Sequence, residues 1–211
     1  MASGDREREA RVTRIIAIAG GSGSGKTTLV TALAAHFGRE ACVISHDRYY
    51  RPVSTDAAAS TNFDEPSALD SALLAEHLSA LRAGRAAFVP GYDFSAFQRM
   101  EGEWVEPAPL VLVEGILVLA APELRPFVDG TLFVDTPEAE RLARRIERDT
   151  VERGRTLRGV LSQYFGTVRP MYERWVAPER ARADRVVDGT TPVDGLVAAL
   201  APWVAGRPDA T

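Results

Sequence analysis

Short apolar runs and segments of helical periodicity alternate along the chain. Residues 13–19 and Leu110–Glu114 are apolar or β-branched at nearly every position, as expected for parallel strands that are buried on both faces. Shorter runs predict three further strands, at Ala41–Ser45, residues 131–134 and residues 185–187. Strands that alternate with helices predict an α/β fold with a mostly parallel sheet and helices on both faces.

Predicted helices fill the intervals between these strands. One follows the first strand at Lys26–Phe37, and another covers residues 66–83, where leucines recur at helical spacing. A strongly charged helix is predicted over residues 137–153, a further helical segment ends near Trp175, and the last helix covers residues 193–203.

The intervening segments read as loops and a small hairpin. Residues 46–64 form a polar stretch rich in Ser and Thr, which predicts a loop. Residues 86–106 contain turn-forming Pro and Gly among aromatic residues and predict a β-hairpin insertion. The chain has 211 residues, which predicts one domain over residues 13–211, preceded by a solvated tail over residues 1–12.

The overall composition excludes several classes of protein. Hydrophobic residues make up 45% of the chain and charged residues 26%, so it is neither disordered nor fibrous. The formal charge of -4 gives no general attraction to nucleic acid or to an anionic membrane. The single cysteine, Cys42, excludes an intramolecular disulfide and is expected to be buried in its strand. The tail has no apolar segment like that of a signal peptide, which predicts a cytoplasmic protein without membrane partners.

A phosphate-binding loop is predicted at residues 20–27. The letters GGSGSGKT fit the pattern G-x-x-x-x-G-K-S/T, and they stand between a predicted strand and a predicted helix. Lys26 is the only lysine among 25 basic residues, and it stands where the motif requires an ammonium group. The alternative is a glycine-rich turn without a ligand. The predicted ATP-binding residues are Gly20, Gly21, Ser22, Gly23, Ser24, Gly25, Lys26, Thr27 and Thr28.

Two oxygen ligands for Mg²⁺ are expected beside this loop. The Thr27 hydroxyl follows the motif lysine, and Glu114 ends the apolar strand that starts at Leu110. A carboxylate at the end of a buried strand can hold the metal's hydration shell, although it can also simply be leaving the core. A guanine-reading N-K-x-D element is excluded, because the only lysine already belongs to the loop. A kinase of a small molecule is therefore favoured over a regulatory GTPase.

Further short motifs resemble the uridine-cytidine kinases and, more broadly, the phosphoribulokinase-like enzymes. The resemblance covers about residues 15–190 and rests on many short runs in the same order and spacing. These runs are ISHDRYY at 44–50, NFDEP at 62–66, PGYDF at 90–94, VEGIL at 113–117, FVDT at 133–136, RLARRIERD at 141–149, ERGR at 152–155 and QY at 163–164.

The resemblance implies a P-loop NTPase fold and an enzyme that uses Mg-ATP. Asp47 matches the general base that accepts a proton from the 5′-hydroxyl of a nucleoside, and it is also placed near the metal. Asp64 matches the carboxylate that accepts hydrogen bonds from the ribose hydroxyls, although it can also cap a helix that starts at Pro66. The residues implied in nucleoside binding are Tyr50, Phe63, Asp64, Tyr92, Phe97, Arg145, Arg155 and Gln163.

The arginine-rich region at about residues 138–165, called the lid segment here, matches the lid of the family. Arg148 and Arg153 are implied as catalytic groups that stabilise charge on the triphosphate, together with Lys26 and Asp47. Gly154 is a candidate hinge. Arg141, Arg144 and Glu147 are expected on a solvated face of the predicted helix, paired with neighbours one turn away.

Two departures from the family pattern leave parts of the function open. Phe97 stands where many members have a histidine that reads the pyrimidine, so uridine, cytidine or both are compatible with the pattern. The stretch at residues 188–191 is altered where members contact adenine, so ATP is implied by the resemblance alone. The alternatives are a phosphoribulokinase-like kinase of another sugar and a nucleotide-binding regulatory module without catalysis. The resemblance also leaves open a homo-oligomer, since family members are often tetramers.

Overall fold

The computed structural model describes residues 13–58 and 61–207, so the predicted tail at residues 1–12 lies outside the described residues. A five-stranded parallel sheet forms its centre, with the strand order β2-β5-β1-β6-β7. The predicted α/β fold with a mostly parallel sheet is confirmed. The strands are β1 (Arg14–Gly20), β2 (Ala41–Ser45), β5 (Leu110–Glu114), β6 (Gly130–Asp135) and β7 (Arg185–Asp188).

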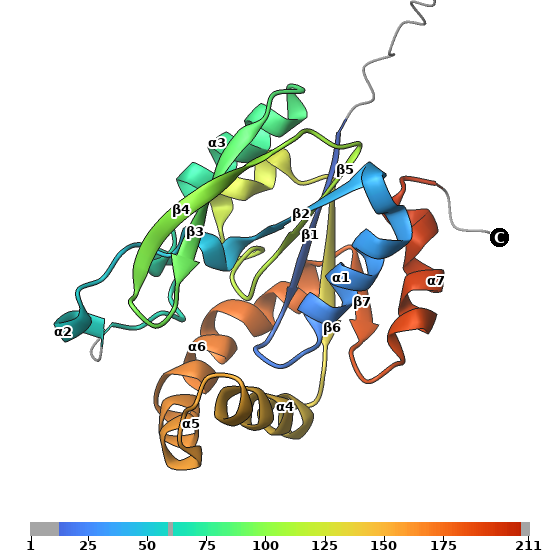
Figure 1. Ribbon diagram of the computed structural model, residues 1–211. Helices are drawn as coiled ribbons and strands as arrows, with labels where there is room; N and C mark the ends of the chain where they lie inside the picture. The colour runs from blue at the N-terminus through green and yellow to red at the C-terminus, as the bar shows by residue number, and fades with distance from the viewer. Residues whose placement is uncertain (1–12, 59–60, 208–211) are drawn as a thin grey trace, which may run out of the picture.

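Strand β1 is buried on both faces, and its side chains alternate between two cores. Ile16 and Ile18 pack in the cluster that also holds Leu33 of α1 (Lys26–Phe37) and Val204 of α7 (Val193–Val204). The side chains between them, such as Ala17, belong to the opposite cluster, which contains the leucines of α3 (Ser71–Arg82). Figure 1 shows α1 and α7 on one side of the sheet and α3 on the other.

A second, two-stranded sheet stands beside the main one. Strands β3 (Ala87–Asp93) and β4 (Gln98–Val105) form the antiparallel hairpin that the sequence predicts. Arg48 joins it to the segment after β2, because its side chain donates to the Pro90 carbonyl at 2.6 Å. This contact holds the middle of β3 beside the carboxyl end of β2.

The lid segment contains α4 (Glu138–Val151) and α5 (Leu157–Gln163). The chain then continues through a π-helical turn at Tyr164–Val168, α6 (Arg169–Met171) and a second π-helical turn at Tyr172–Val176. In Figure 1, α4, α5 and α6 gather at one end of the sheet. The predicted helical segment to Trp175 is thus present, although it is not α-helical throughout.

Several predictions of local structure are wrong. The helix predicted over residues 66–83 is divided into a 3₁₀ turn at Pro66–Ala68 and α3. Asp70 caps α3, with its side chain accepting from the Leu73 amide, and Asp64 does not cap a helix at Pro66. The loop predicted at residues 46–64 contains a 3₁₀ turn, His46–Tyr49, and the short α2, Thr55–Ala58.

Two predictions of exposure are also wrong. Cys42 is half-buried, because β2 is an edge strand of the sheet. Arg141 is 4% exposed, although it was expected on a solvated face. Its guanidinium lies 3.9 Å from the centre of the Tyr172 ring, and its Nε donates to the Thr136 carbonyl at 3.0 Å, which explains the burial. Over the described residues, the structure has no helix with the length and apolar character that crossing a bilayer requires.

Candidate active site

The phosphate loop connects β1 to the first turn of α1. Gly23 and Gly25 have φ values of 80° and 91°, in the left-handed region that glycine adopts without strain. A Cβ atom at Gly23 would also lie 2.3 Å from the carbonyl oxygen of Arg141, so no side chain fits there. The loop therefore presents backbone amides at a helix N-terminus, which is an arrangement suited to binding phosphate.

Glu114 lies next to this loop because of the strand order. Strand β5 is hydrogen-bonded to both β1 and β2, and Glu114 is in register with Ile18 on one side and Ser45 on the other. Its carboxylate accepts from Thr27 at 3.3 Å and from Ser45 at 2.7 Å, and the residue is only 5% exposed. These hydroxyls orient a buried carboxylate at the carboxyl edge of the sheet. No group of three or more His, Cys, Asp or Glu residues that could hold a metal is present in the described part of the chain.

Asp47 lies in the 3₁₀ turn that directly follows β2. Its Oδ1 is buried and has no hydrogen-bond partner among the described residues. Burial, and next the negative charge of Glu114, raise the pKa of Asp47 to about 6, although Lys26 and Arg153 act in the opposite direction. Asp47 therefore combines a raised pKa with a buried carboxylate oxygen that accepts no hydrogen bond from the described residues.

A single cavity of about 580 Å³ brings together most of the residues that the sequence singles out. It lies between the phosphate loop, the hairpin and the lid segment. The residues named from sequence that line it are Ser22, Lys26, Thr27, Asp47, Tyr50, Phe63, Asp64, Tyr92, Phe97, Arg145, Arg148, Arg153, Arg155 and Gln163. Glu114, Thr28 and the loop glycines are not among its lining residues.

One wall of the cavity is aromatic. Tyr50 packs edge-on against Phe63, with the ring centres 5.8 Å apart, and Phe63 stacks on Phe97 at 5.3 Å. Tyr92 lies 5.5 Å from Tyr50 and is 8% exposed, yet its hydroxyl has no partner among the described residues. An aromatic wall of this kind suits a flat ring.

Asp64 lies on the same cavity between this aromatic wall and the arginines. Burial raises the pKa of its carboxyl, while the charge of Arg145 lowers it. Its backbone amide donates to the side chain of Asn62 at 3.1 Å, which fixes the local turn. Its carboxylate has acceptor capacity for two hydroxyl donors.

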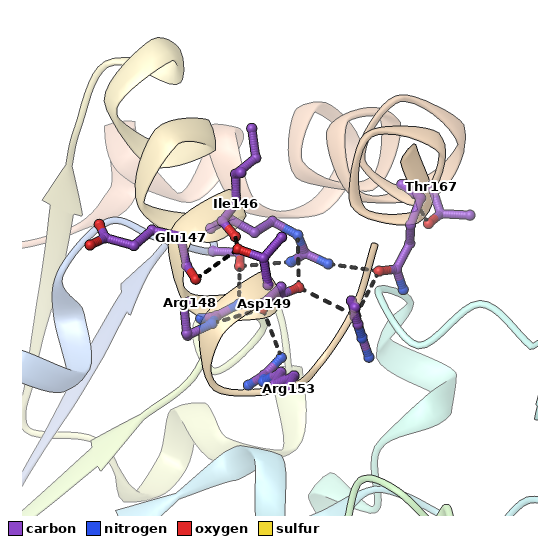
Figure 2. Close-up of polar contacts among 11 residues, drawn as sticks. Ile146, Glu147, Arg148, Asp149, Arg153 and Thr167 are labelled. Carbon is purple, nitrogen blue, oxygen red and sulfur yellow. Dashed lines mark hydrogen bonds and ion pairs between the residues drawn. The ribbon is translucent and has the colours of Figure 1, made fainter. Parts of the chain in front are cut away.

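The opposite wall carries the arginines of the lid segment. Arg145 donates to the Ser22 hydroxyl at 2.8 Å and to the Gln163 side chain at 2.9 Å. Arg155 donates to the same Gln163 oxygen at 2.9 Å. Figure 2 shows Arg148, Asp149 and Arg153 in a network of polar contacts. The hydrogen bond from Arg145 to Ser22 connects the lid segment to the phosphate loop.

A family model describes most of the chain. Residues 15–194 match the model of the phosphoribulokinase / uridine kinase family. The chain belongs to this family.

Relatives and solved structures agree with the match. A protein named uridine kinase from Chloroflexus aurantiacus is 44% identical over 180 residues, which cover 83% of this chain and 86% of the relative. Another uridine kinase, from Clostridium perfringens, is 41% identical and covers 82% and 85% of the two chains. Phosphoribulokinase from Rhodobacter spheroides is only 16% identical but shares the fold, with a TM-score of 0.63 over 87% of this chain and 74% of that one.

The structure places at or beside the site further residues to which the sequence assigned no role, including Thr61, Ile116, Gly159, Ser162 and Thr167, which line the cavity. Ser45 holds Glu114, Phe94 lines the cavity, and Asp149 contacts four arginines. Phe94 and Asp149 stand inside runs that carry the family resemblance, so the sequence did contain a signal for them. Ser45 could have been found from its place at the end of a strand beside Asp47.

Phe97, at the tip of the hairpin, has an unusual backbone conformation. It is the only described residue other than glycine with a positive φ, at 55°, which is a strained value for a bulky side chain. Its carbonyl accepts from the Val53 amide at 3.0 Å, and the Gln98 side chain donates back to the Val53 carbonyl at 2.9 Å. These contacts hold the hairpin tip so that the Phe97 ring faces the cavity.

Proposed function

We propose that the protein is a pyrimidine ribonucleoside kinase of salvage, which transfers the γ-phosphoryl group of ATP to the 5′-hydroxyl of uridine, cytidine or both. The products are UMP or CMP and ADP. The observation that carries the proposal is the position of Asp47, which lines the same cavity as Lys26 and Asp64. The names of the relatives and the extent of their similarity support the choice of nucleoside.

Binding of the phosphate donor rests on the loop, its lysine and the lid arginines. The backbone amides of the loop and the ammonium of Lys26 would surround the β- and γ-phosphates. Arg148 and Arg153 line the cavity from the other side and would stabilise the charge that spreads over the phosphoryl oxygens during transfer.

The residues beside the loop fit a magnesium ion. Thr27 and Glu114 would supply hard oxygen ligands or bind the waters of a hydrated ion, and the Asp47 carboxylate, whose pKa is raised by the charge of Glu114, would lie near that ion. When bound, Mg²⁺ would neutralise charge on the phosphates. Ser45 would keep the Glu114 carboxylate oriented toward that ion.

Asp47 would orient the acceptor hydroxyl and take its proton as the phosphoryl group arrives. An alcohol is a weak nucleophile, and a carboxylate within hydrogen-bond reach both aligns it and accepts the proton. A pKa of about 6 leaves Asp47 mostly ionised at neutral pH and still basic enough to assist.

The nucleoside would lie between Asp64 and the aromatic wall. Asp64 would accept hydrogen bonds from the 2′- and 3′-hydroxyls of ribose, and Arg145 and Gln163 line the same region. Phe63, Phe97 and Tyr92 line the same cavity and would form the apolar wall against which a pyrimidine packs. Closure of the lid segment would exclude water and so limit hydrolysis of ATP.

A panel of acceptors tests this proposal. Purified protein is given Mg-ATP with uridine, cytidine, purine nucleosides or ribulose 5-phosphate, and ADP release is measured. We expect release to be stimulated by uridine, cytidine or both, and to be lost in Asp47→Asn. Stimulation by the sugar phosphate alone would assign the protein to the sugar kinases, and no stimulation by any acceptor would leave a regulatory module. We further propose that the protein is cytoplasmic and acts on small molecules without a nucleic-acid partner.

A further inference from the structure

A buried carboxylate at Asp149 lies at the centre of the lid arginines. Its side chain is 0% exposed, and four guanidinium groups contact it from the same helix and from the turn that follows. Figure 2 shows Asp149 between Arg148 and Arg153, with dashed lines to the surrounding guanidinium groups. Asp149 does not line the cavity, so it can influence a ligand only through these arginines.

Each oxygen of the carboxylate serves two arginines. Oδ1 accepts from Arg148 at 2.9 Å and lies 3.3 Å from Arg153. Oδ2 lies 3.3 Å from Arg155 and 3.6 Å from Arg145. Because one negative charge is shared among four positive ones, the cluster keeps a formal charge of +3, which favours the binding of a polyanion beside it.

The backbone carbonyl of Asp149 also stabilises the turn after α4, which brings Arg153 and Arg155 back beside the helix. The Arg155 amide donates to the Asp149 carbonyl at 3.0 Å, and Gly154 between them has a φ of 62°. Without this closure, Arg153 and Arg155 would leave the end of α4 in another direction. The same residue therefore fixes the guanidinium groups through its side chain and the chain path through its carbonyl.

The far ends of the arginines reach the phosphate loop. Arg145 donates to the Ser22 hydroxyl at 2.8 Å, and Arg148 approaches the same oxygen at 3.4 Å. The Ser22 hydroxyl thus accepts hydrogen bonds from guanidinium groups that lie beside the phosphate loop, where the polyphosphate would bind. Arg145 and Arg148 are therefore held with their donors directed into the cavity.

We infer that Asp149 is a positioning residue, which holds Arg148 and Arg153 as a clamp for the polyphosphate of the donor, while Arg145 and Arg155 are also held by Gln163. The inference rests on the proposed function for the identity of that polyphosphate. A clamp of this kind accelerates transfer because its groups need no rearrangement as charge develops. The pKa of Asp149 is consistent with a permanent anion: burial raises it, but Arg145 and Arg148 outweigh that effect and lower it overall.

Neutralising the Asp149 carboxylate distinguishes two effects of this residue: the positioning of the arginines and the overall electrostatic attraction of a polyanion. In Asp149→Asn the formal charge of the cluster rises from +3 to +4, so long-range attraction of a polyanion increases. The guanidinium groups, however, repel one another without the shared carboxylate and lose their alignment. Attraction and catalysis are therefore expected to change in opposite directions, whereas general damage to the fold would weaken both.

The test compares Asp149→Asn with Glu147→Gln, which neutralises an exposed carboxylate on the same helix. We expect kcat to fall at least tenfold in Asp149→Asn and to stay within twofold in Glu147→Gln. The KM for uridine should stay within about threefold. The Kd for tripolyphosphate, measured by calorimetry, should be unchanged or lower than in the wild type. Asp149→Glu keeps the charge and should recover part of the lost kcat.

Several outcomes would overturn the inference. One is a kcat in Asp149→Asn equal to that of the Glu147→Gln control, and another is weaker binding of tripolyphosphate together with the loss of kcat. If Asp149→Asn does not fold, Asp149→Glu tests the inference instead. The longer side chain displaces the carboxylate, so a kcat equal to that of the wild type would contradict a positioning role. Failure of the proposed function looks different: the wild type would bind tripolyphosphate but would not turn over any nucleoside.

Discussion

Asp47 is held in a state that favours chemistry over stability. Its carboxylate is removed from water and faces the negative charge of Glu114, and its Oδ1 receives no hydrogen bond from the described residues. The positive charges of Lys26 and Arg153 partly offset the free-energy cost of ionising this carboxyl, but the pKa of Asp47 still rises to about 6. Both the pH dependence of the reaction and the stability of the protein should report this environment.

The titration of Asp47 should determine how kcat/KM changes at acidic pH. A general base must be ionised, so kcat/KM for the nucleoside should fall as the pH drops below about 6 and level off above it. Because the charge of Glu114 raises the pKa of Asp47, Glu114→Gln should move its titration to lower pH. The measurement is kcat/KM from pH 5 to 8 for the wild type, with NMR titration of Asp47 in both proteins. A titration that does not shift in Glu114→Gln would contradict the proposed electrostatic coupling.

Asp47→Asn should be nearly inactive and yet more stable. A carboxyl whose pKa is raised on folding destabilises the folded state once it ionises, so the gain from neutralising it is absent below about pH 4 and complete above about pH 6. We expect a gain on the order of 2 kcal/mol in the free energy of unfolding at pH 7. Urea unfolding at pH 3.5 and pH 7 measures it. Equal stability of variant and wild type at pH 7 would argue that Asp47 is well solvated.

At the scale of elements, the turn between α4 and α5 depends on one glycine. Gly154 has a φ of 62°, and a Cβ added there would meet nothing within 4 Å. A substitution at this position is therefore opposed by backbone conformation alone and not by crowding. Gly166, in the π-helical turn at Tyr164–Val168, has equally free space without a positive φ.

These two glycines make a matched pair for substitution. Gly154→Ala should lower the free energy of unfolding by about 1 kcal/mol and lower kcat, because Arg153 and Arg155 flank the turn. Gly166→Ala should be neutral or stabilising by up to about 1 kcal/mol, since alanine is preferred within helices. Thermal unfolding and initial rates measure both effects. Similar losses of stability and kcat in the two variants would contradict a specific requirement for glycine in the turn at Gly154.

The boundaries of elements show where the sequence was informative. The helix Lys26–Phe37 and the strand Leu110–Glu114 were predicted with the bounds that the structure has, because both are bordered by strong signals such as Gly25, Gly38 and Gly115. The helix predicted over residues 66–83 was wrong at its start. Its first turn is pulled away by long-range contacts: the Arg51 amide donates to the Ala68 carbonyl and the Asp70 amide to the Tyr49 carbonyl.

At the scale of the whole molecule, the cavity depends on three parts of the fold that approach one another. The phosphate loop, the hairpin and the lid segment all contribute lining residues. Arg153 of the lid segment lies over the Phe94 ring of the hairpin, with 5.9 Å between its guanidinium carbon and the ring centre. Ligands that contact all three parts should therefore stabilise the molecule as a unit.

Thermal stability in the presence of ligands should reveal this coupling. A ligand at one hundred times its Kd adds about 2.7 kcal/mol. For a protein of this size, that corresponds to an increase in Tm of roughly 5–10 °C. We expect this increase with a nonhydrolysable ATP analogue and uridine together, and a smaller one with ribulose 5-phosphate. Differential scanning fluorimetry measures it, and an increase with the sugar phosphate that exceeds the one with uridine would favour the sugar-kinase alternative.

The sequence by itself determined the phosphate loop, the parallel α/β fold and the family, because these depend on local signals: glycine positions, apolar runs and short motifs. It also named most residues that line the cavity. Only the tertiary structure decided how they work together. Ser22 and Arg145 are 123 residues apart in sequence, and Ser45 and Glu114 are 69 apart. Contacts at such separations follow from strand order and helix packing, so the burial of Asp149 among four arginines, the free oxygen of Asp47 and the strained turn at Phe97 became visible only in the folded chain.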